Sequence, residues 1–153
     1  MEKSVVVQQI KKIWQEQVPF NQVLGIRITE FNHQLAEIRF AWQPQLVGNP
    51  IKQILHGGVT ASALDFAGGV VCAASIIERL ELDKLSAEAI HESLAKMGTI
   101  DLRTDFLRPG RGKEFITTAK IIRSGNKVAV ARMEMHNELG DHIAFGTGTY
   151  MVG

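Results

Sequence analysis

Hydrophobic side chains follow two different periods along the chain, and the period changes near residue 97. Residues 3–16 carry apolar side chains at helical spacing, which predicts a short amphipathic helix closed by Pro19. Between residues 26 and 42, apolar and polar positions alternate around a polar turn, as expected of two antiparallel strands. The glycine and prolines of residues 44–55 then indicate a loop.

From Gly57 to Ile77 the chain is almost free of charge, and Asp65 is the only acidic or basic side chain in that stretch. At about 100° per residue, small residues gather on the Asp65 side of the predicted helix, whereas bulkier residues lie about 120° round. The small side comprises Gly58, Ala61, Ser62, Gly68, Gly69 and Cys72, and the bulky side comprises Val59, Ala63, Phe66, Val70 and Ile77. We expect the bulky side to fill the core and the small side to leave room around the carboxylate. The alternative is that the small residues only let another backbone pack closely.

Asp65 needs a specific explanation, because an ionised carboxylate in an apolar helix costs on the order of several kcal/mol unless it is paired or hydrogen-bonded. The helix is long enough to raise the question of a membrane span. Its content of Gly, Ala and Ser and the central position of Asp65 favour a buried helix of a soluble protein instead. We therefore interpret Asp65 as a residue that serves the chemistry of the protein rather than its solubility.

The second half of the chain predicts mostly strands. Residues 78–96 are charged, with apolar residues at helical spacing, and predict a second, surface helix. Three turn signals divide the remainder into four antiparallel strands at about 99–108, 113–123, 127–136 and 142–151. Strands, then a helix, then more strands give an α+β fold class, and a curved sheet wrapped round the long helix would bury it best.

Composition limits the partners that need to be considered. With 153 residues and 45% hydrophobic content, residues 1–153 are expected to form a single domain. The net charge of +1 gives no global reason to expect nucleic acid or an anionic membrane as a partner. The single cysteine and the polar N-terminus, which does not match a signal peptide, favour a cytoplasmic location.

One group of motifs is specific enough to suggest a family. His56-Gly57-Gly58 precedes the long helix, Asp65 follows nine residues after the histidine, and a later strand ends in Leu107-Arg108-Pro109. This combination resembles the hot-dog fold acyl-CoA thioesterases of the PaaI-like branch, and within that branch the chain is most similar to the bacterial YigI-type thioesterases. The similarity extends over nearly the whole chain and includes Thr99–Pro109, Arg123–Lys127 and Gly146–Val152.

The resemblance implies a sheet wrapped round the central helix, an obligate homodimer with active sites at its interface, and an acyl-CoA substrate. Pairing of dimers into a tetramer stays open. The implied catalytic group is Asp65, as a general base on water or as a nucleophile that forms a mixed anhydride. The backbone N–H of Gly58, in the Gly57-Gly58 turn at the helix N-terminus, would stabilise the oxyanion. Gly58 and Asp65 of one site would come from different chains.

The other implied site residues have weaker support. His56 would orient the loop or the substrate carbonyl. Thr99 would help to position the water, although a threonine at a strand start also serves structural roles. Some relatives carry a substrate-binding Asn or Gln where this chain has Pro50, so Asn49 becomes the candidate. The CoA phosphates would be held by Arg108, Arg123 and Lys127, for which a solvated strand face is the alternative.

Several other chemistries lack support in the sequence. Cys72 has no histidine at local spacing, and the five histidines show no metal-ligand grouping along the chain, so neither a cysteine nucleophile nor a metal or other cofactor is expected. The leading hypothesis is hydrolysis of medium- to long-chain acyl-CoA. A hot-dog hydratase or dehydratase and a non-catalytic acyl-CoA-binding dimer are the alternatives. Asp65, without a glutamate in the central helix up to Ile77, favours the thioesterase.

Overall fold

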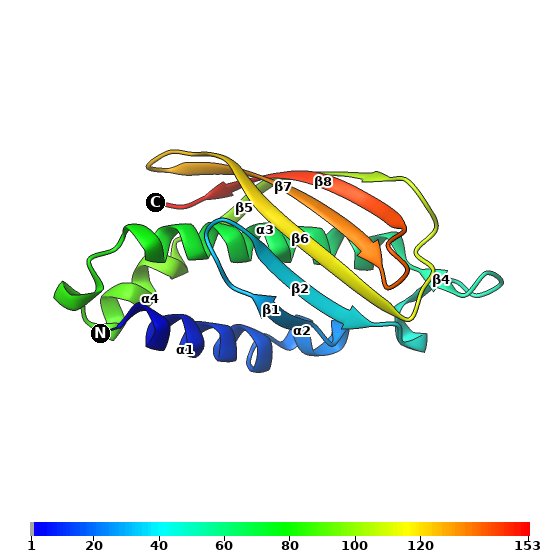
Figure 1. Cartoon of the computed structure of the whole chain (residues 1–153), viewed down its shortest axis with the longest axis horizontal. Helices are drawn as coiled ribbons and strands as arrows, with labels where there is room; N and C mark the ends of the chain where they lie inside the picture. The colour runs from blue at the N-terminus through cyan, green and yellow to red at the C-terminus, as the bar shows by residue number, and fades with distance from the viewer. Residues whose placement is uncertain (1) are drawn as a thin grey trace.

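A computed structural model, which describes residues 2–153, shows an antiparallel six-stranded sheet that curves over one side of a long helix, α3 (Gly57–Arg79) (Figure 1). The strand order is β1-β2-β6-β7-β8-β5. The strands are β1 (Arg27–Glu30), β2 (Ala36–Ala41), β5 (Gly98–Phe106), β6 (Glu114–Ser124), β7 (Val128–Asn137) and β8 (His142–Met151). The predicted α+β class and the curved sheet around a central helix are confirmed.

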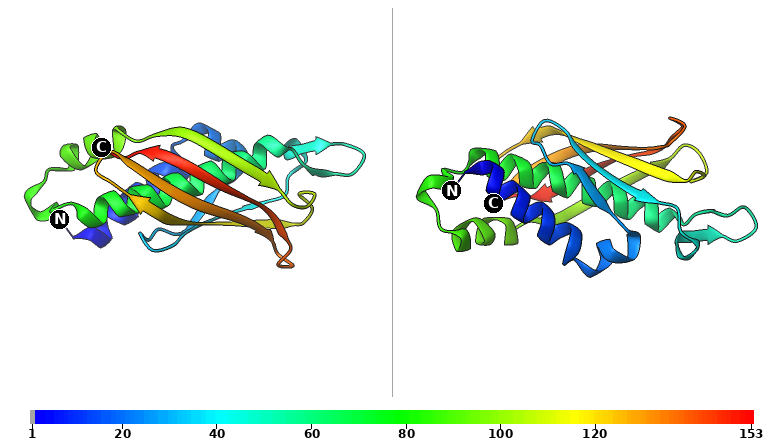
Figure 2. Two further views of the ribbon diagram at one scale, coloured as in Figure 1. Left: turned by 90° about the horizontal axis from the view of Figure 1, so that it is seen from above. Right: turned by 60° about the horizontal axis from the view of Figure 1, so that its bottom comes forward.

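The sheet presents one apolar face to α3, and its strands cross the helix obliquely (Figure 2). Along β7, Ala129, Ala131, Met133 and Met135 are buried, whereas the residues between them are half-buried on the outer face. This alternation follows from the two-residue period of a strand and gives the sheet an inner and an outer set of side chains.

Helix α3 is the centre of the core. Its residues Ala63, Leu64, Ala67 and Val70 are fully buried, and two thirds of its most apolar stretch lies inside the protein. By length and composition alone this helix could cross a membrane, but here the sheet and α1 (Lys3–Glu16) cover it. Burial in the protein core therefore explains the apolar surface of this helix.

The small side of α3 is not uniformly open. A Cβ at Gly68 would collide with the ring of Tyr150, which fills the space beside that glycine. A Cβ at Gly69 would meet nothing within 4 Å. The expectation that the small residues leave room around Asp65 therefore holds at Gly69 and is wrong at Gly68, where an aromatic ring packs instead.

The helix predicted over residues 3–16 has the bounds of α1, but the sequence does not predict two further elements ahead of α3, a short second helix and a small hairpin. Pro19 does more than close α1, since it begins a second helix, α2 (Pro19–Leu24), in whose first turn a proline fits well. Gly25, with φ +70°, ends that helix. The predicted loop 44–55 contains a 3-10 turn, Pro44–Leu46, and a small hairpin of β3 (Val47–Asn49) and β4 (Ile54–Leu55).

The predicted surface helix over residues 78–96 is shorter than expected. Helix α3 continues to Arg79, a 3-10 turn covers Leu82–Lys84, and only α4 (Ala87–Ala95) is an α-helix. Ser86 caps α4 by accepting a hydrogen bond from the backbone N–H of Ala89 at 3.1 Å. The helical conformation is thus interrupted twice within this range, on either side of the 3-10 turn, before β5 begins.

The two edges of the sheet differ in length and in character. At one edge β1 is short and polar. At the other, β5 is nine residues long and, among residues 2–153, pairs only with β8. It carries exposed apolar side chains, with Ile100 53% and Phe106 57% exposed. A long edge strand with exposed apolar side chains is suited to pairing with another chain.

Candidate active site

The N-terminus of α3 is capped by a histidine side chain. The His56 backbone is extended, and its Nδ1 accepts a hydrogen bond from the N–H of Gly58 at 2.8 Å. A neutral imidazole that accepts at Nδ1 carries its proton on Nε2, which leaves an N–H donor on the outer side of the ring. The Gly58 amide is thus already engaged, and in this structure it is not free to donate to a substrate oxygen, the role expected of it.

Gly57, one residue earlier, has a backbone amide that is free to donate, whereas the Gly58 amide is engaged by His56. The Gly57 N–H donates to no acceptor among residues 2–153, and Gly57 begins the helix, where the backbone dipole favours negative charge. A Cβ at this position would lie 3.3 Å from the Phe106 ring. Gly57 also lines an open pocket of about 390 Å³ with Phe106, Leu107 and Arg108. The Gly57 amide is therefore the one that the turn leaves free to donate.

Asp65 lies half-buried on α3 and is hydrogen-bonded to Thr99. The Thr99 hydroxyl donates to Asp65 Oδ1 at 2.8 Å, and Thr99 lies near the start of β5, at a bulge in its pairing with β8. No donor among residues 2–153 reaches Asp65 Oδ2. The structure thus brings two predicted site residues together and leaves one carboxylate oxygen for water or substrate.

Tyr150 fixes the helical turn that carries Asp65, and sequence reasoning missed it. Its hydroxyl donates to the backbone carbonyl of Asp65 at 2.9 Å, and the residue is only 2% exposed. Burial raises the pKa of the Tyr150 hydroxyl far above its usual value, and the nearby Asp65 carboxylate adds to the rise. Tyr150 therefore stays protonated and keeps donating. The only signal in the sequence is the space left by Gly68 and Gly148, both of which contact its ring.

A mostly apolar pocket opens beside the carboxylate. Its volume is about 210 Å³, and Asp65 and Thr99 share it with four large hydrophobic side chains. These are Trp14, Val18, Phe66 and Met97. The rings of Trp14 and Phe66 lie 6.0 Å apart and form part of its wall. A carboxylate at the mouth of such a pocket is suited to a substrate with an apolar chain next to a reactive carbonyl.

The two halves of the candidate site are far apart within one chain. Asp65 lies eight residues beyond Gly57 on the same helix, which corresponds to about 12 Å along the axis. A thioester carbonyl must lie about 3 Å from both its attacking group and its oxyanion donor. A single chain therefore does not bring the Gly57 amide and the Asp65 carboxylate to one carbonyl.

Asn49 has a local structural role. Its side-chain Oδ1 accepts hydrogen bonds from the backbone N–H groups of Ile51 and Lys52, both at 3.1 Å. Such an arrangement is typical of an asparagine that stabilises its own turn. The predicted substrate contact of Asn49 is thus weakened, because its acceptor oxygen is in use.

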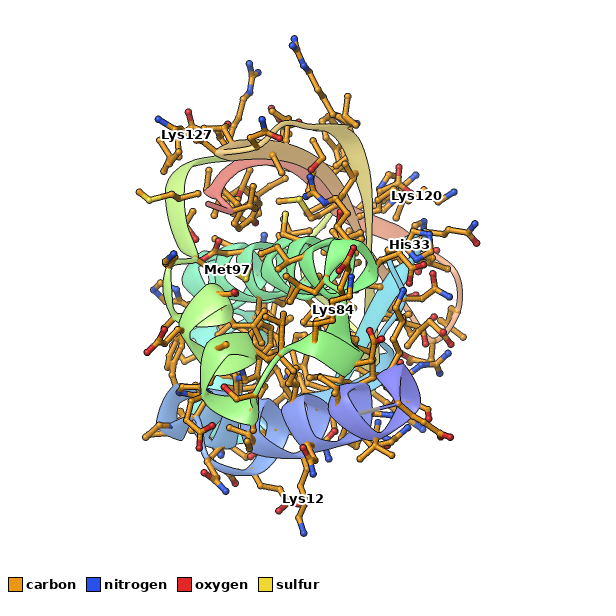
Figure 3. The ribbon with its side chains drawn as sticks, turned by 90° about the vertical axis from the view of Figure 1, so that its left-hand side faces the viewer. Lys12, His33, Lys84, Met97, Lys120 and Lys127 are labelled. Atoms are coloured by element: carbon orange, nitrogen blue, oxygen red, sulfur yellow. The ribbon has the colours of Figure 1, made fainter. Side chains whose placement is uncertain are left out.

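The three basic residues proposed for the CoA phosphates do not form one cluster within the chain. Arg108 lies in the Gly57 pocket, and its Nη1 donates to the His142 carbonyl at 2.9 Å. Arg123 and Lys127 lie at the far end of β6, about 30 Å away along the strand. Figure 3 shows Lys127 at the rim of the sheet, above the end of α3 that faces the viewer.

Cys72 is fully buried in α3, and burial raises the pKa of its thiol to about 12. At pH 8 the thiolate fraction should be on the order of 10⁻⁴, so the folded protein should react very slowly with a disulfide reagent. The same reagent should modify one thiol per chain at once in denaturant. Fast labelling of the native protein would show that the thiol is accessible.

A group of possible metal ligands lies outside this site. Glu134, His136 and His142 place their ligand atoms within 4.8 Å of one another. Along the chain these histidines show no metal-binding spacing, because a hairpin turn separates them. Their mirrored positions on either side of that turn are the signal that could have revealed them.

Comparison with known proteins places the chain in a family. Residues 52–144 match the family model described as the thioesterase superfamily. The chain is 51% identical over 136 residues to the medium/long-chain acyl-CoA thioesterase YigI of Escherichia coli K12, covering 89% of this chain and 86% of that protein.

Solved structures agree with that placement. A Shewanella oneidensis protein described as related to the thioesterase superfamily superposes with a TM-score of 0.92 at 45% identity, covering 99% of this chain and 97% of the other. The Escherichia coli PaaI protein of the phenylacetic acid degradation operon shares the fold, with a TM-score of 0.76 at 22% identity over 99% and 96% of the two chains. The hot-dog fold expected from the motifs is thus confirmed, and so is the expected class of enzyme, a thioester hydrolase. The chain belongs to the thioesterase superfamily.

Proposed function

We propose that this protein hydrolyses medium- to long-chain acyl-CoA to free fatty acid and CoA. The observation that carries the proposal is the Asp65 carboxylate, held by the Thr99 hydroxyl at the mouth of an apolar pocket. Supporting it, the relative at 51% identity is named for medium/long-chain acyl-CoA hydrolysis. The large side chains of the pocket, including Trp14 and Phe66, suit an acyl chain better than a short polar group.

In the proposed reaction, a water bound at Asp65 Oδ2 attacks the thioester carbonyl carbon and passes a proton to the carboxylate. Negative charge develops on the carbonyl oxygen, which the Gly57 N–H stabilises. The C–S bond then breaks, and the CoA sulfur takes up the proton. As the alternative, Asp65 itself attacks, and water hydrolyses the resulting mixed anhydride. Thr99 orients the carboxylate, and His56 keeps the Gly58 amide occupied so that the turn holds its shape.

We infer that the site is completed by a second copy of the chain. The free edge of β5 carries Thr99 near its start and Phe106 at its end, and Phe106 lies next to Gly57. If two β5 edges pair antiparallel about a twofold axis, the start of one lies beside the end of the other. The Asp65 and Thr99 of one chain would then face the Gly57 and Phe106 of its partner, which removes the 12 Å separation derived above from the helix rise.

The same exchange of ends would bring the basic residues together. Lys127 lies near the start of β5, because Val128 pairs with Met151 and Met151 pairs with Gly98. Arg108 follows the end of β5. Across the twofold axis, Arg108 of one chain would approach the Arg123 and Lys127 end of the other, where they could share the CoA phosphates. Whether two such dimers pair further is not decided by this geometry.

Two broader expectations accompany the proposal. We propose that residues 1–153 form one domain, because one continuous hydrophobic core includes residues from Val6 to Val152. A cytoplasmic location stays a prediction, supported by a single buried cysteine that forms no disulfide.

A panel of substrates tests the proposed activity. Purified protein is offered acyl-CoAs from acetyl to palmitoyl, and phenylacetyl-CoA, and the released CoA is titrated with a thiol reagent. The value of kcat/KM should rise about fourfold per methylene group buried in the pocket, up to a medium or long chain. A maximum at acetyl or phenylacetyl would refute the proposed chain length. Binding without CoA release would indicate the acyl-CoA-binding dimer. To test the hydratase, an enoyl-CoA is offered as well. Loss of its enoyl absorbance without CoA release would indicate that activity.

A further inference from the structure

Three side chains with metal-binding groups converge on the outer face of the sheet. Glu134 and His136 are two residues apart on β7, and His142, at the start of β8, lies directly opposite His136 in the ladder. Alternate residues of a strand point to the same face, and directly opposed residues have Cβ atoms about 4.5–5.5 Å apart. The strand register itself therefore places the three groups together.

One atom of this group lacks a partner. The Nε2 of His142 is buried, and no hydrogen-bond partner reaches it among residues 2–153. The two imidazole rings stack with their centroids 4.4 Å apart and an angle of 9° between their planes. Glu134 forms no salt bridge among the same residues. A buried, unpaired nitrogen is unfavourable unless a further group satisfies it, and the nearby Glu134 carboxylate is not held by any cationic side chain among these residues.

We propose that Glu134, His136 and His142 bind a divalent transition-metal ion, with Zn²⁺ as the best match. Two imidazole nitrogens and one carboxylate oxygen are a common Zn²⁺ ligand set, which leaves the fourth position to water. Ligand bonds of about 2.0–2.2 Å require ligand atoms about 3–4 Å apart. The present spread of up to 4.8 Å closes by small rotations of half-buried side chains, which unstack the two rings.

The surrounding charges oppose a cation and limit the expected affinity. Lys120 and Arg132 are paired across β6 and β7 on the same face as Glu134. The Arg132 guanidinium lies over the Phe145 ring, 4.0 Å from its centroid, so its charge is held by an aromatic face. An open depression of about 360 Å³, lined by Glu134, Lys120 and Arg132, reaches the cluster from the Glu134 side. We therefore expect a site that is reversible and accessible rather than one on which folding depends.

The bound ion would brace one end of the sheet. It would link the last residues of strand β7 to the first residue of β8 across the 137–141 hairpin. The carbonyl of His142 also accepts the hydrogen bond from Arg108, so the ion would steady the residue that anchors that side chain. This role does not depend on the proposed thioesterase activity, and its test uses binding alone.

Zn²⁺ titration of chelator-treated protein against a chromophoric chelator tests the proposal. The wild type should bind one ion per chain, and His142→Gln and His136→Gln should each weaken binding by about 100-fold or more. His91→Gln, on α4 and outside the cluster, is the matched control and should bind like the wild type. Wild-type protein that does not compete with the chelator, or His142→Gln that binds as well as the wild type, would overturn the proposal.

Two further measurements keep the result interpretable if a variant folds poorly. Zn²⁺ should raise the unfolding temperature of the wild type and of His91→Gln but leave that of Glu134→Gln unchanged, while circular dichroism without metal shows whether each variant is folded. Co²⁺ in place of Zn²⁺ should give the absorption of nitrogen and oxygen ligands. A sulfur charge-transfer band would instead show that Cys72 holds the ion, which contradicts the proposed ligand set.

Discussion

Replacing Asp65 by Asn is expected to lower kcat for acyl-CoA hydrolysis by about 10³–10⁴-fold. The amide keeps the size of the carboxylate, and its Oδ1 can still accept the hydrogen bond from Thr99. It can neither take up a proton from water nor attack the thioester. Because the apolar pocket is unchanged, KM should change little. The measurement is steady-state CoA release, with circular dichroism to show that the variant is folded. A variant that keeps a tenth of the wild-type kcat would exclude Asp65 as base and as nucleophile.

Thr99 provides the comparison that separates positioning from chemistry. Thr99→Val removes the hydroxyl and keeps the branched shape, so we expect a loss of about tenfold in kcat, whereas Thr99→Ser should retain most activity. If the hydroxyl acts only by orienting Asp65, the valine substitution should have no further effect in the Asp65→Asn background. Equal losses in both backgrounds would show that Thr99 acts on the substrate by another route.

The sequence predicts those elements well whose signal is local and periodic. The strand predicted at 142–151 is β8, His142–Met151, and the helix predicted from Gly57 to Ile77 ends only two residues later, at Arg79. The errors have physical causes. Pro19 stops one helix and fits the first turn of the next, so the residue type alone does not distinguish the two outcomes. Over residues 78–96, Ile90 and Leu94 turn toward the core, and this tertiary contact sets where α4 lies.

The candidate site shows the same division between local and distant information. Parity along β5 places Thr99 outside the core, where it meets Asp65. Which of the Gly57 and Gly58 amides is free to donate depends on the ring orientation of His56, and this orientation cannot be predicted from the spacing of residues in the sequence. The hydroxyl of Tyr150 reaches a carbonyl 85 residues away, and His136 meets His142 only through the strand register. Contacts of this kind arise from the folded topology rather than from any segment of the chain.

Replacing Gly57 by Pro removes the proposed oxyanion donor with little disturbance of the helix. Proline is favourable at the first helical position, and the extended His56 backbone, with φ −62° and ψ 136°, is the conformation required before a proline. Removing one such donor should lower kcat by about 10²–10³-fold. Gly57→Ala is the matched control, because it adds a Cβ against the exposed Phe106 ring and keeps the N–H. Equal losses in both variants would trace the effect to crowding.

Combining the two inactive variants in one dimer should restore activity, because we propose that Gly57 and Asp65 of one site come from different chains. A heterodimer of Gly57→Pro and Asp65→Asn chains, isolated through two different tags, keeps one intact site and should show about half of the wild-type activity. A chain with both substitutions, paired with a wild-type chain, should be nearly inactive, because each site then lacks one group. If both groups acted within one chain, the two results would be reversed. The pair of heterodimers therefore decides the arrangement without relying on the size of either single effect.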